Sequence, residues 1–187
     1  MTFQIENVLE LSEIIYSAIS DYGEQRILSD IVQGESPDVI KSIFEHCLSN
    51  IEKNETVKSD TCGAVAEGLL HYMLTVSMIS SQRKTLFQSV EVDIAVPDTR
   101  TLAVSPQDVI IVSFPKTDNV ESIKSQIEKI KKIQPNSNNV WVVLENNVPI
   151  EAKVYTLKDS MTFANIINDL ISFSSTKKQS KLKIFKI

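Results

Sequence analysis

The sequence predicts an α/β fold preceded by an N-terminal helical segment, and three observations lead to this prediction. Two short apolar runs rich in β-branched residues, at 109–114 and 140–144, are typical of strands buried on both faces of a sheet. A segment with apolar residues at helical spacing, 118–133, lies between them. The first third of the chain carries helical patterns. A chain of 187 residues is long enough to bury a core without disulfides or metals.

The composition is that of an ordinary globular protein, with 42% hydrophobic and 23% charged residues, which argues against a large disordered region. The chain has no charged-then-apolar leader and no apolar run near twenty residues. We therefore expect a soluble, cytoplasmic protein without a membrane span. Its two cysteines, Cys47 and Cys62, are too few for a disulfide framework or a cysteine metal cluster.

Charge is distributed unevenly along the chain. Residues 1–60 carry twelve acidic and four basic residues, so this part should repel nucleic acid and favours a protein partner or a second copy of the chain. Residues 176–187 carry five lysines and no acid. They could contact phosphate as a flexible tail or form a solvated terminus. The net charge of −5 excludes a strongly basic DNA-binding domain.

Three helices are predicted in the acidic first part. Apolar residues at helical spacing mark residues 3–20 and a shorter helix at 27–32. Ser36-Pro37-Asp38 begins the third helix, because serine caps, proline suits the first turn and an acid favours the positive end of the dipole. Its apolar stripe makes Cys47 a core residue. The polar stretch 52–60 suggests a boundary, which gives a helical segment 1–60, an α/β core 61–175 and a basic tail 176–187.

A long helix is predicted at 61–84, and it is apolar almost all round, as buried helices are. Glu67 and His71 lie four residues apart on one of its faces. An ionised carboxylate there is costly unless it is paired or bound to a metal. An internal hydrogen bond between the two, or a partly exposed stripe, explains the pair equally well.

The strands follow this helix. Residues 90–96 begin with alternating apolar and polar residues, which puts Glu91 and Asp93 on one side of a strand. The buried strand 109–114 follows, with Lys116 just beyond it, at the end where open α/β sheets carry their sites. Further strands are expected at 100–104, 140–144 and 152–157, and a last helix at 161–173.

From residue 61 to 157 the chain resembles the core of the PD-(D/E)XK nuclease superfamily. The helix with Glu67, the strand motif Val-Glu-Val-Asp-Ile ending at Ile94, and the strand leading to Lys116 carry the resemblance. It implies a restriction-endonuclease-like fold, a mixed sheet flanked by helices, and magnesium-dependent cleavage of DNA. By position, Asp93 matches the metal-binding aspartate, Lys116 the lysine of the second strand, and Glu67 the acid of the preceding helix.

The motif is degenerate at one position. The family pattern calls for Asp or Glu two residues before the lysine, and this chain has Phe114, which cannot bind magnesium. Pro115 removes a ladder donor beside the lysine, and Ser113 is expected to face the other way. Glu91, Asp98 or Asp108 could supply a migrated carboxylate. If Glu67 and Asp93 point to opposite sides of the sheet, the nuclease hypothesis is excluded.

Three functions remain open from the sequence. The first is a nuclease-like protein without catalysis, acting as a binding or assembly module related to DNA-processing nucleases. The second is an active magnesium-dependent DNA endonuclease in which Asp93 and Glu91 bind metal and Lys116 and Glu67 assist. The third is an unrelated α/β protein-interaction domain. Nucleic acid is the partner expected for the first two, and a protein or a second copy could bind the acidic N-terminal helices.

Overall fold

The computed structural model describes residues 2–52 and 61–182. The helices are α1 (Thr2–Tyr22), α2 (Glu24–Val32), α3 (Ser36–Glu52), α4 (Thr61–Val76), α5 (Thr99–Val104), α6 (Val120–Ile133) and α7 (Ile166–Leu182). The strands are β1 (Gln82–Phe87), β2 (Val90–Val96), β3 (Ile110–Ser113), β4 (Val140–Leu144) and β5 (Lys153–Thr156). Three 3-10 turns, η1 (Pro106–Asp108), η2 (Ser137–Asn139) and η3 (Asp159–Asn165), complete the described elements.

The five strands form one mixed sheet in the order β1-β2-β3-β4-β5. The pairs β1–β2 and β2–β3 are antiparallel, whereas β3–β4 and β4–β5 are parallel. The parallel step from β3 to β4 is made through α6, as a crossover helix requires. The predicted α/β class, with a mixed sheet flanked by helices, is therefore confirmed, and β1 is an edge strand.

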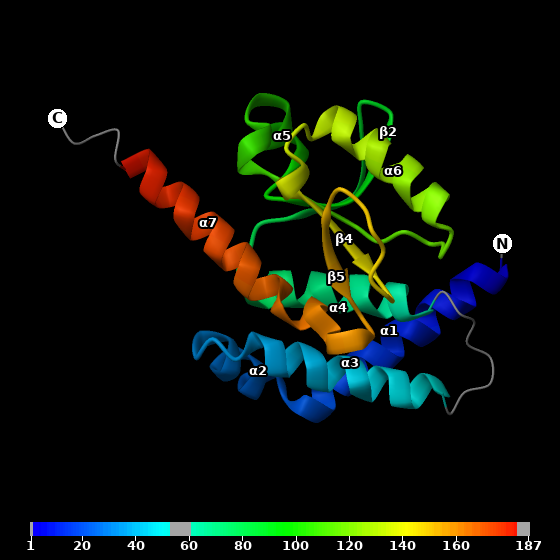
Figure 1. The fold of residues 1–187 in the computed structure, drawn as a ribbon. Helices are drawn as coiled ribbons and strands as arrows, with labels where there is room; N and C mark the ends of the chain where they lie inside the picture. Colours follow the sequence, from blue (N-terminus) through cyan, green and yellow to red (C-terminus); the bar gives the residue numbers. More distant parts are fainter. Residues whose placement is uncertain (1, 53–60, 183–187) are drawn as a thin grey trace.

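Helices cover both faces of this sheet (Figure 1). On one face, α5 and α6 pack through residues such as Leu102 and Ile127 against Ile111 and Val142. On the other face, α4 and the start of α7 form a larger core with Val112 and Val143. The N-terminal helices belong to this same core: Ile19, Ile40 and Phe44 are buried in it, and so is the predicted core residue Cys47.

The helix predicted at 61–84 is wrong at its end, because α4 stops at Val76 and residues 82–87 form β1. Met78 adopts a left-handed backbone with φ 54°. Its N–H donates to the Thr75 carbonyl and that of Ile79 donates to the Leu74 carbonyl, which is the bonding of a Schellman helix end. Glycine normally marks this position, so the sequence carried no stop signal.

The strand predicted at 100–104 is also wrong, because these residues lie in α5. Asp98 begins this helix as its N-cap: its Oδ1 accepts a hydrogen bond of 2.7 Å from the Thr101 backbone N–H. That bond lowers the pKa of the Asp98 carboxyl. The capping aspartate was the signal that outweighed the strand preference of threonine and valine.

The C-terminal helix is longer than predicted. The turn η3 precedes it, and α7 then continues to Leu182, so the backbone is helical in residues 176–182, the first part of the predicted basic tail. The predicted boundary segment 53–60 and the last five residues of the tail lie outside the described residues. In Figure 1 the C-terminal half of α7 projects away from the sheet and helices.

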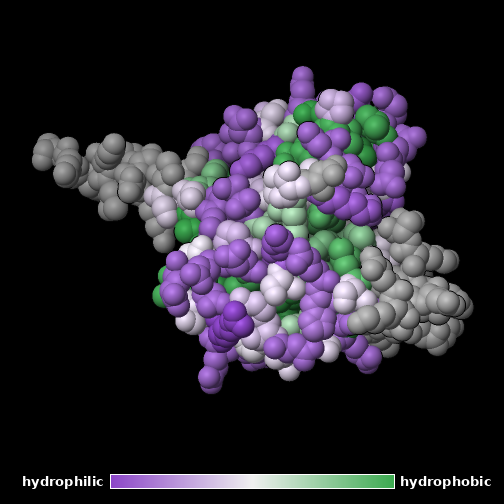
Figure 2. Space-filling view, turned by 60° about the horizontal axis from the view of Figure 1, so that its bottom comes forward, coloured by the Kyte–Doolittle hydropathy of each residue, from purple (hydrophilic) through white to green (hydrophobic). Residues whose placement is uncertain are grey.

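Hydrophilic residues cover most of the face shown in Figure 2, and apolar residues form smaller patches between them. Among the described helices, none is long and apolar enough to cross a membrane.

Candidate functional site

A groove of about 880 Å³ lies between the β1–β2 hairpin and α6, at the carboxyl end of β3. Its lining includes three residues that the sequence singled out, Glu91, Asp93 and Lys116. Gln126 and Lys129 of α6 line the same groove. The structure therefore brings most of the predicted site residues together at the end of the sheet where α/β folds place their sites.

Asp93 is the most firmly held of these groups. Its Oδ2 accepts a 3.0 Å bond from the Ser113 hydroxyl and a 2.8 Å bond from the Phe114 backbone N–H. Burial raises the pKa of the Asp93 carboxyl, and these two bonds act in the opposite direction. The carboxylate of Glu67 is near enough to raise this pKa as well, and the Lys116 ammonium lowers it. Asp93 is thus an acid fixed at the edge of a groove.

The sequence did not identify Ser113 as a site residue, because alternation placed it on the side of the strand opposite Phe114. Ser113 is buried and, besides donating to Asp93, accepts a 3.0 Å bond from Gln126 Nε2. A chain of hydrogen bonds therefore runs from α6 through β3 to β2. Ser113 does face away from Phe114, because Phe114 lies in the core on the α4 side and Ser113 faces α6. The sequence did not show that Asp93 is reached from the Ser113 side.

Lys116 lies in the loop after β3, with an exposed side chain. Phe114 is buried against the core on the α4 side, with 5% of its surface exposed, and only its backbone N–H reaches Asp93. The position at which the resembled family carries a second acid therefore contributes no side-chain oxygen. Pro115 follows the last paired residue, where a missing donor costs the sheet nothing.

Glu67 lies on α4, which packs on the opposite face of the sheet from α6. Its Oε1 is 3.1 Å from Arg83 Nη2 and 3.4 Å from Lys84 Nζ, both on β1. These two cations pair with the Glu67 carboxylate, which would be costly to bury in its ionised form without a partner. Burial lowers the pKa of His71, and the Arg83 guanidinium lowers it further, so His71 is neutral at pH 7.

The other predicted acids are dispersed. Glu91 is exposed and lines the groove beside Asp93. Asp98 caps α5, and Asp108 lies in the turn η1; neither of these two lines the groove. Within residues 2–52 and 61–182, no three histidine, cysteine, aspartate or glutamate side chains form a cluster suited to a metal ion. Among the acids that line the groove, Asp93 is held in place by hydrogen bonds from a buried hydroxyl and a backbone N–H.

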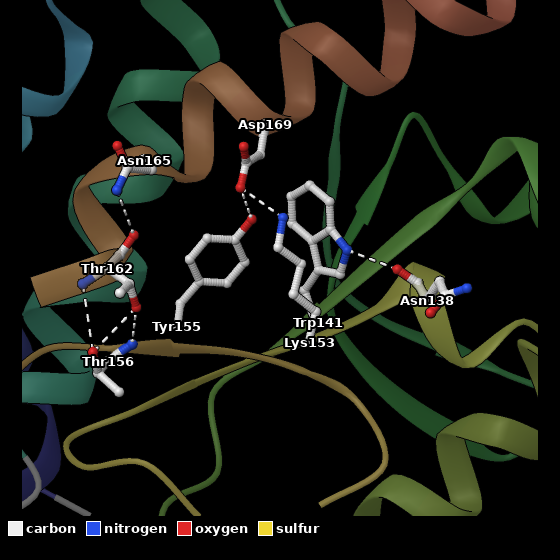
Figure 3. A network of polar contacts seen from close by, with 8 residues as sticks. All are labelled: Asn138, Trp141, Lys153, Tyr155, Thr156, Thr162, Asn165 and Asp169. Atoms are coloured by element: carbon white, nitrogen blue, oxygen red, sulfur yellow. Dashed lines mark hydrogen bonds and ion pairs between the residues drawn. The ribbon is translucent and has the colours of Figure 1, made fainter.

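A second polar network, unexpected from the sequence, joins β4 and β5 to α7 (Figure 3). Asp169 accepts bonds of 2.6 Å from both Lys153 Nζ and the Tyr155 hydroxyl. The Lys153 ammonium lies 4.6 Å from the Trp141 ring centroid, a cation–π contact. Trp141 and Tyr155 are 4% and 2% exposed, so no ligand can reach their rings. The network holds α7 on the sheet and is structural.

Two further predictions concern the N-terminal half. Burial raises the pKa of the Cys47 thiol to about 11, which makes it a poor nucleophile, as a core cysteine should be. The predicted protein contact through the acidic N-terminal helices stays a prediction. Tyr16 on α1 and Leu28 and Val32 on α2 are exposed apolar side chains in that region.

No protein-family model and no curated protein sequence matches this chain. Its structure is similar to that of a restriction endonuclease, PspGI, solved as a complex with its substrate DNA. The match has a TM-score of 0.62 and covers 89% of this chain and 93% of that chain, at 12% sequence identity. The fold is therefore restriction-endonuclease-like, and the match extends beyond residues 61–157, to which the sequence resemblance was confined.

Proposed function

We propose that this protein is a nuclease-fold module that binds nucleic acid in the groove beside Asp93 and does not cleave it. One observation carries the proposal. Asp93 and Lys116 line the groove, but Phe114 takes the place of the second acid, and Glu67 is engaged by Arg83 and Lys84 on the α4 side. Metal-dependent phosphodiester cleavage needs carboxylates that converge on the ion.

Nucleic acid is favoured as the ligand by two features. The structurally similar protein was solved with substrate DNA. In this chain, Lys116 and Lys129 line the groove, both are exposed, and neither forms an ion pair with a described residue. Free ammonium groups in a groove suit phosphate oxygens, and the overall charge of −5 means that attraction depends on these local cations.

A second candidate is an active endonuclease with a migrated carboxylate. Glu91 and Asp93 line the same groove, and Glu121 of α6 lines it too. Magnesium often binds to only one or two carboxylates, with water and substrate phosphate supplying the other oxygens. In that case Asp93 and Glu91 would hold the ion and Lys116 would face the phosphate. The two candidates differ in cleavage, whereas both require binding.

Fluorescence anisotropy with labelled oligonucleotides at several salt concentrations tests the binding common to both. The two phosphate contacts made by Lys116 and Lys129 contribute about −1.8 to the slope of log affinity against log salt for duplex DNA. The double variant Lys116→Gln, Lys129→Gln should remove this contribution and weaken binding. Lys41→Gln, an exposed lysine on α3, is the matched control. Equal affinity of the double variant and the control would contradict a nucleic-acid role for the groove.

A further inference from the structure

On the edge strand β1, two cations pair with one buried carboxylate. Arg83 and Lys84 are consecutive residues, yet both side chains reach the same atom, Oε1 of Glu67. Consecutive side chains of a regular strand point to opposite faces. Lys84 has a left-handed backbone with φ 43°, which breaks the alternation and turns its side chain to the same side. Such a backbone is strained for a residue other than glycine.

Arg83 and Lys84 both pair with the Glu67 carboxylate. The nearby Asp93 carboxylate accepts instead from the Ser113 hydroxyl and the Phe114 N–H, and His71, the next titratable group on α4, is neutral. Glu67 is buried, with 11% of its side chain exposed, whereas the Lys84 side chain is 65% exposed. Solvent therefore meets the cation and not the acid. Among the described residues, Arg83 Nε has no hydrogen-bond acceptor, so the bonding of the guanidinium is incomplete.

The cluster adjoins the groove. The pairs Arg83↔Ile94 and Thr85↔Val92 flank Lys84 and place it across from Asp93 on the neighbouring strand. Leu86, two residues further along β1, lines the groove itself. The strained backbone of Lys84 thus presents a second cation beside the groove. A cation in this position is suited to bind an anionic group of a ligand that lies in the groove.

We infer that Glu67, Arg83 and Lys84 form a phosphate-binding subsite, in which Glu67 is a positioning residue and Lys84 donates to a phosphate oxygen of a nucleic acid. This inference rests on the proposed function and names a group that the nucleic acid would present. The chemistry is that of a tetrahedral oxyanion held by ammonium and guanidinium groups. Free phosphate shares this chemistry, so the test includes both.

The first arm measures oligonucleotide binding by anisotropy. Lys84→Gln should weaken binding roughly fivefold and reduce the magnitude of the salt slope by about 0.9, because one phosphate contact is lost. Lys84→Arg, which keeps the cation, should bind like the wild type. Lys41→Gln is again the control for lost charge. If Lys84→Gln behaves like Lys41→Gln, the subsite is refuted, even where Lys116→Gln shows that the groove binds.

The second arm does not depend on oligonucleotide binding. Inorganic phosphate is titrated at constant ionic strength while the Arg83 Nε–H signal is followed by NMR. A saturable shift that Lys84→Gln abolishes supports a phosphate subsite, and it would do so even if no oligonucleotide bound and the proposed function failed. Oligonucleotide binding that depends on Lys84, without a response to free phosphate, supports a subsite that needs the polymer. If neither arm shows an effect that depends on Lys84, the inference is overturned.

Discussion

Replacing Ser113 with alanine tests how the groove holds its acid. The hydroxyl of Ser113 donates to Asp93 Oδ2 and accepts from Gln126, so the substitution removes the link between α6, β3 and β2. It leaves the Phe114 N–H bond in place. Alanine is smaller by one atom, so the effect comes from the hydrogen bonds and not from repacking.

The magnitude follows from the charge of the acceptor. A hydrogen bond to a charged group stabilises a protein by about 1.5–3 kcal/mol, and a neutral one by about 0.5–1.5 kcal/mol. Gln126 is half-buried at the groove and can turn to water instead. We therefore expect Ser113→Ala to lower the free energy of unfolding at pH 7 by about 1.5–3 kcal/mol. In a chain of this size that lowers the Tm by about 3–12 °C.

The assay is urea unfolding at several pH values. The pKa of Asp93 lies above its ordinary value, so acidification protonates the folded acid more readily than an ordinary carboxyl and makes the lost bond a neutral one. The loss in Ser113→Ala should then shrink to about half. Ser125→Ala, an exposed serine on α6 that also lines the groove, should change stability by less than about 0.5 kcal/mol. The reasoning would be refuted if Ser113→Ala lost less than about 0.5 kcal/mol of stability at pH 7, or if its loss were larger in acid than at pH 7.

Three further predictions concern the acid, the strained strand and the α7 anchor. Burial makes the ionised form of Asp93 unfavourable in the folded protein. This destabilisation is absent at pH values below the ordinary pKa of a carboxyl, and it is complete at pH values above the raised pKa of Asp93. Asp93→Asn should therefore gain stability relative to the wild type as the pH rises from about 4 to about 7 in urea unfolding; a flat difference contradicts this. Lys84→Gly should be about 1 kcal/mol more stable than Lys84→Ala, because only glycine relieves the positive φ; equal midpoints would deny the strain. Asp169→Ala strands the buried Tyr155 hydroxyl and should cost about 1–3 kcal/mol, and adding Tyr155→Phe should restore part of it; additive losses would argue against the coupling.

Periodicity predicted the elements that are buried on one side or on both. The helical stripe that contains Cys47 has the pattern of an element buried on one side, and the apolar runs at 109–114 and 140–144 have the pattern of strands buried on both faces. The structure places all three in the core. Helix and strand ends were harder. Met78 ends α4 without glycine, and Asp98 begins α5 among residues that prefer strands, so single backbone angles and caps decided these boundaries.

The site could be predicted by residue type but not by geometry. Glu91, Asp93 and Lys116 line one groove, as their positions in the sequence suggested. Ser113 was missed because the site was expected on the side of Phe114, whereas Asp93 is reached from the opposite side, which Ser113 occupies. Glu67 was assigned to the same centre; Arg83 and Lys84 pair with its carboxylate, which lies near enough to Asp93 to raise the pKa of that acid. No sequence pattern predicted that pairing, because it depends on one left-handed residue.

Incubation of supercoiled plasmid DNA with the protein and either magnesium or manganese tests the central claim most directly. Asp93→Asn, prepared in the same way, reveals any contaminating nuclease. The claim is that the groove binds nucleic acid while its carboxylates do not converge on a metal ion. It predicts that the wild type leaves the plasmid supercoiled with either metal, at protein concentrations that saturate binding in the anisotropy assay. Nicked or linear product that forms with the wild type and not with Asp93→Asn would contradict it and establish the active endonuclease.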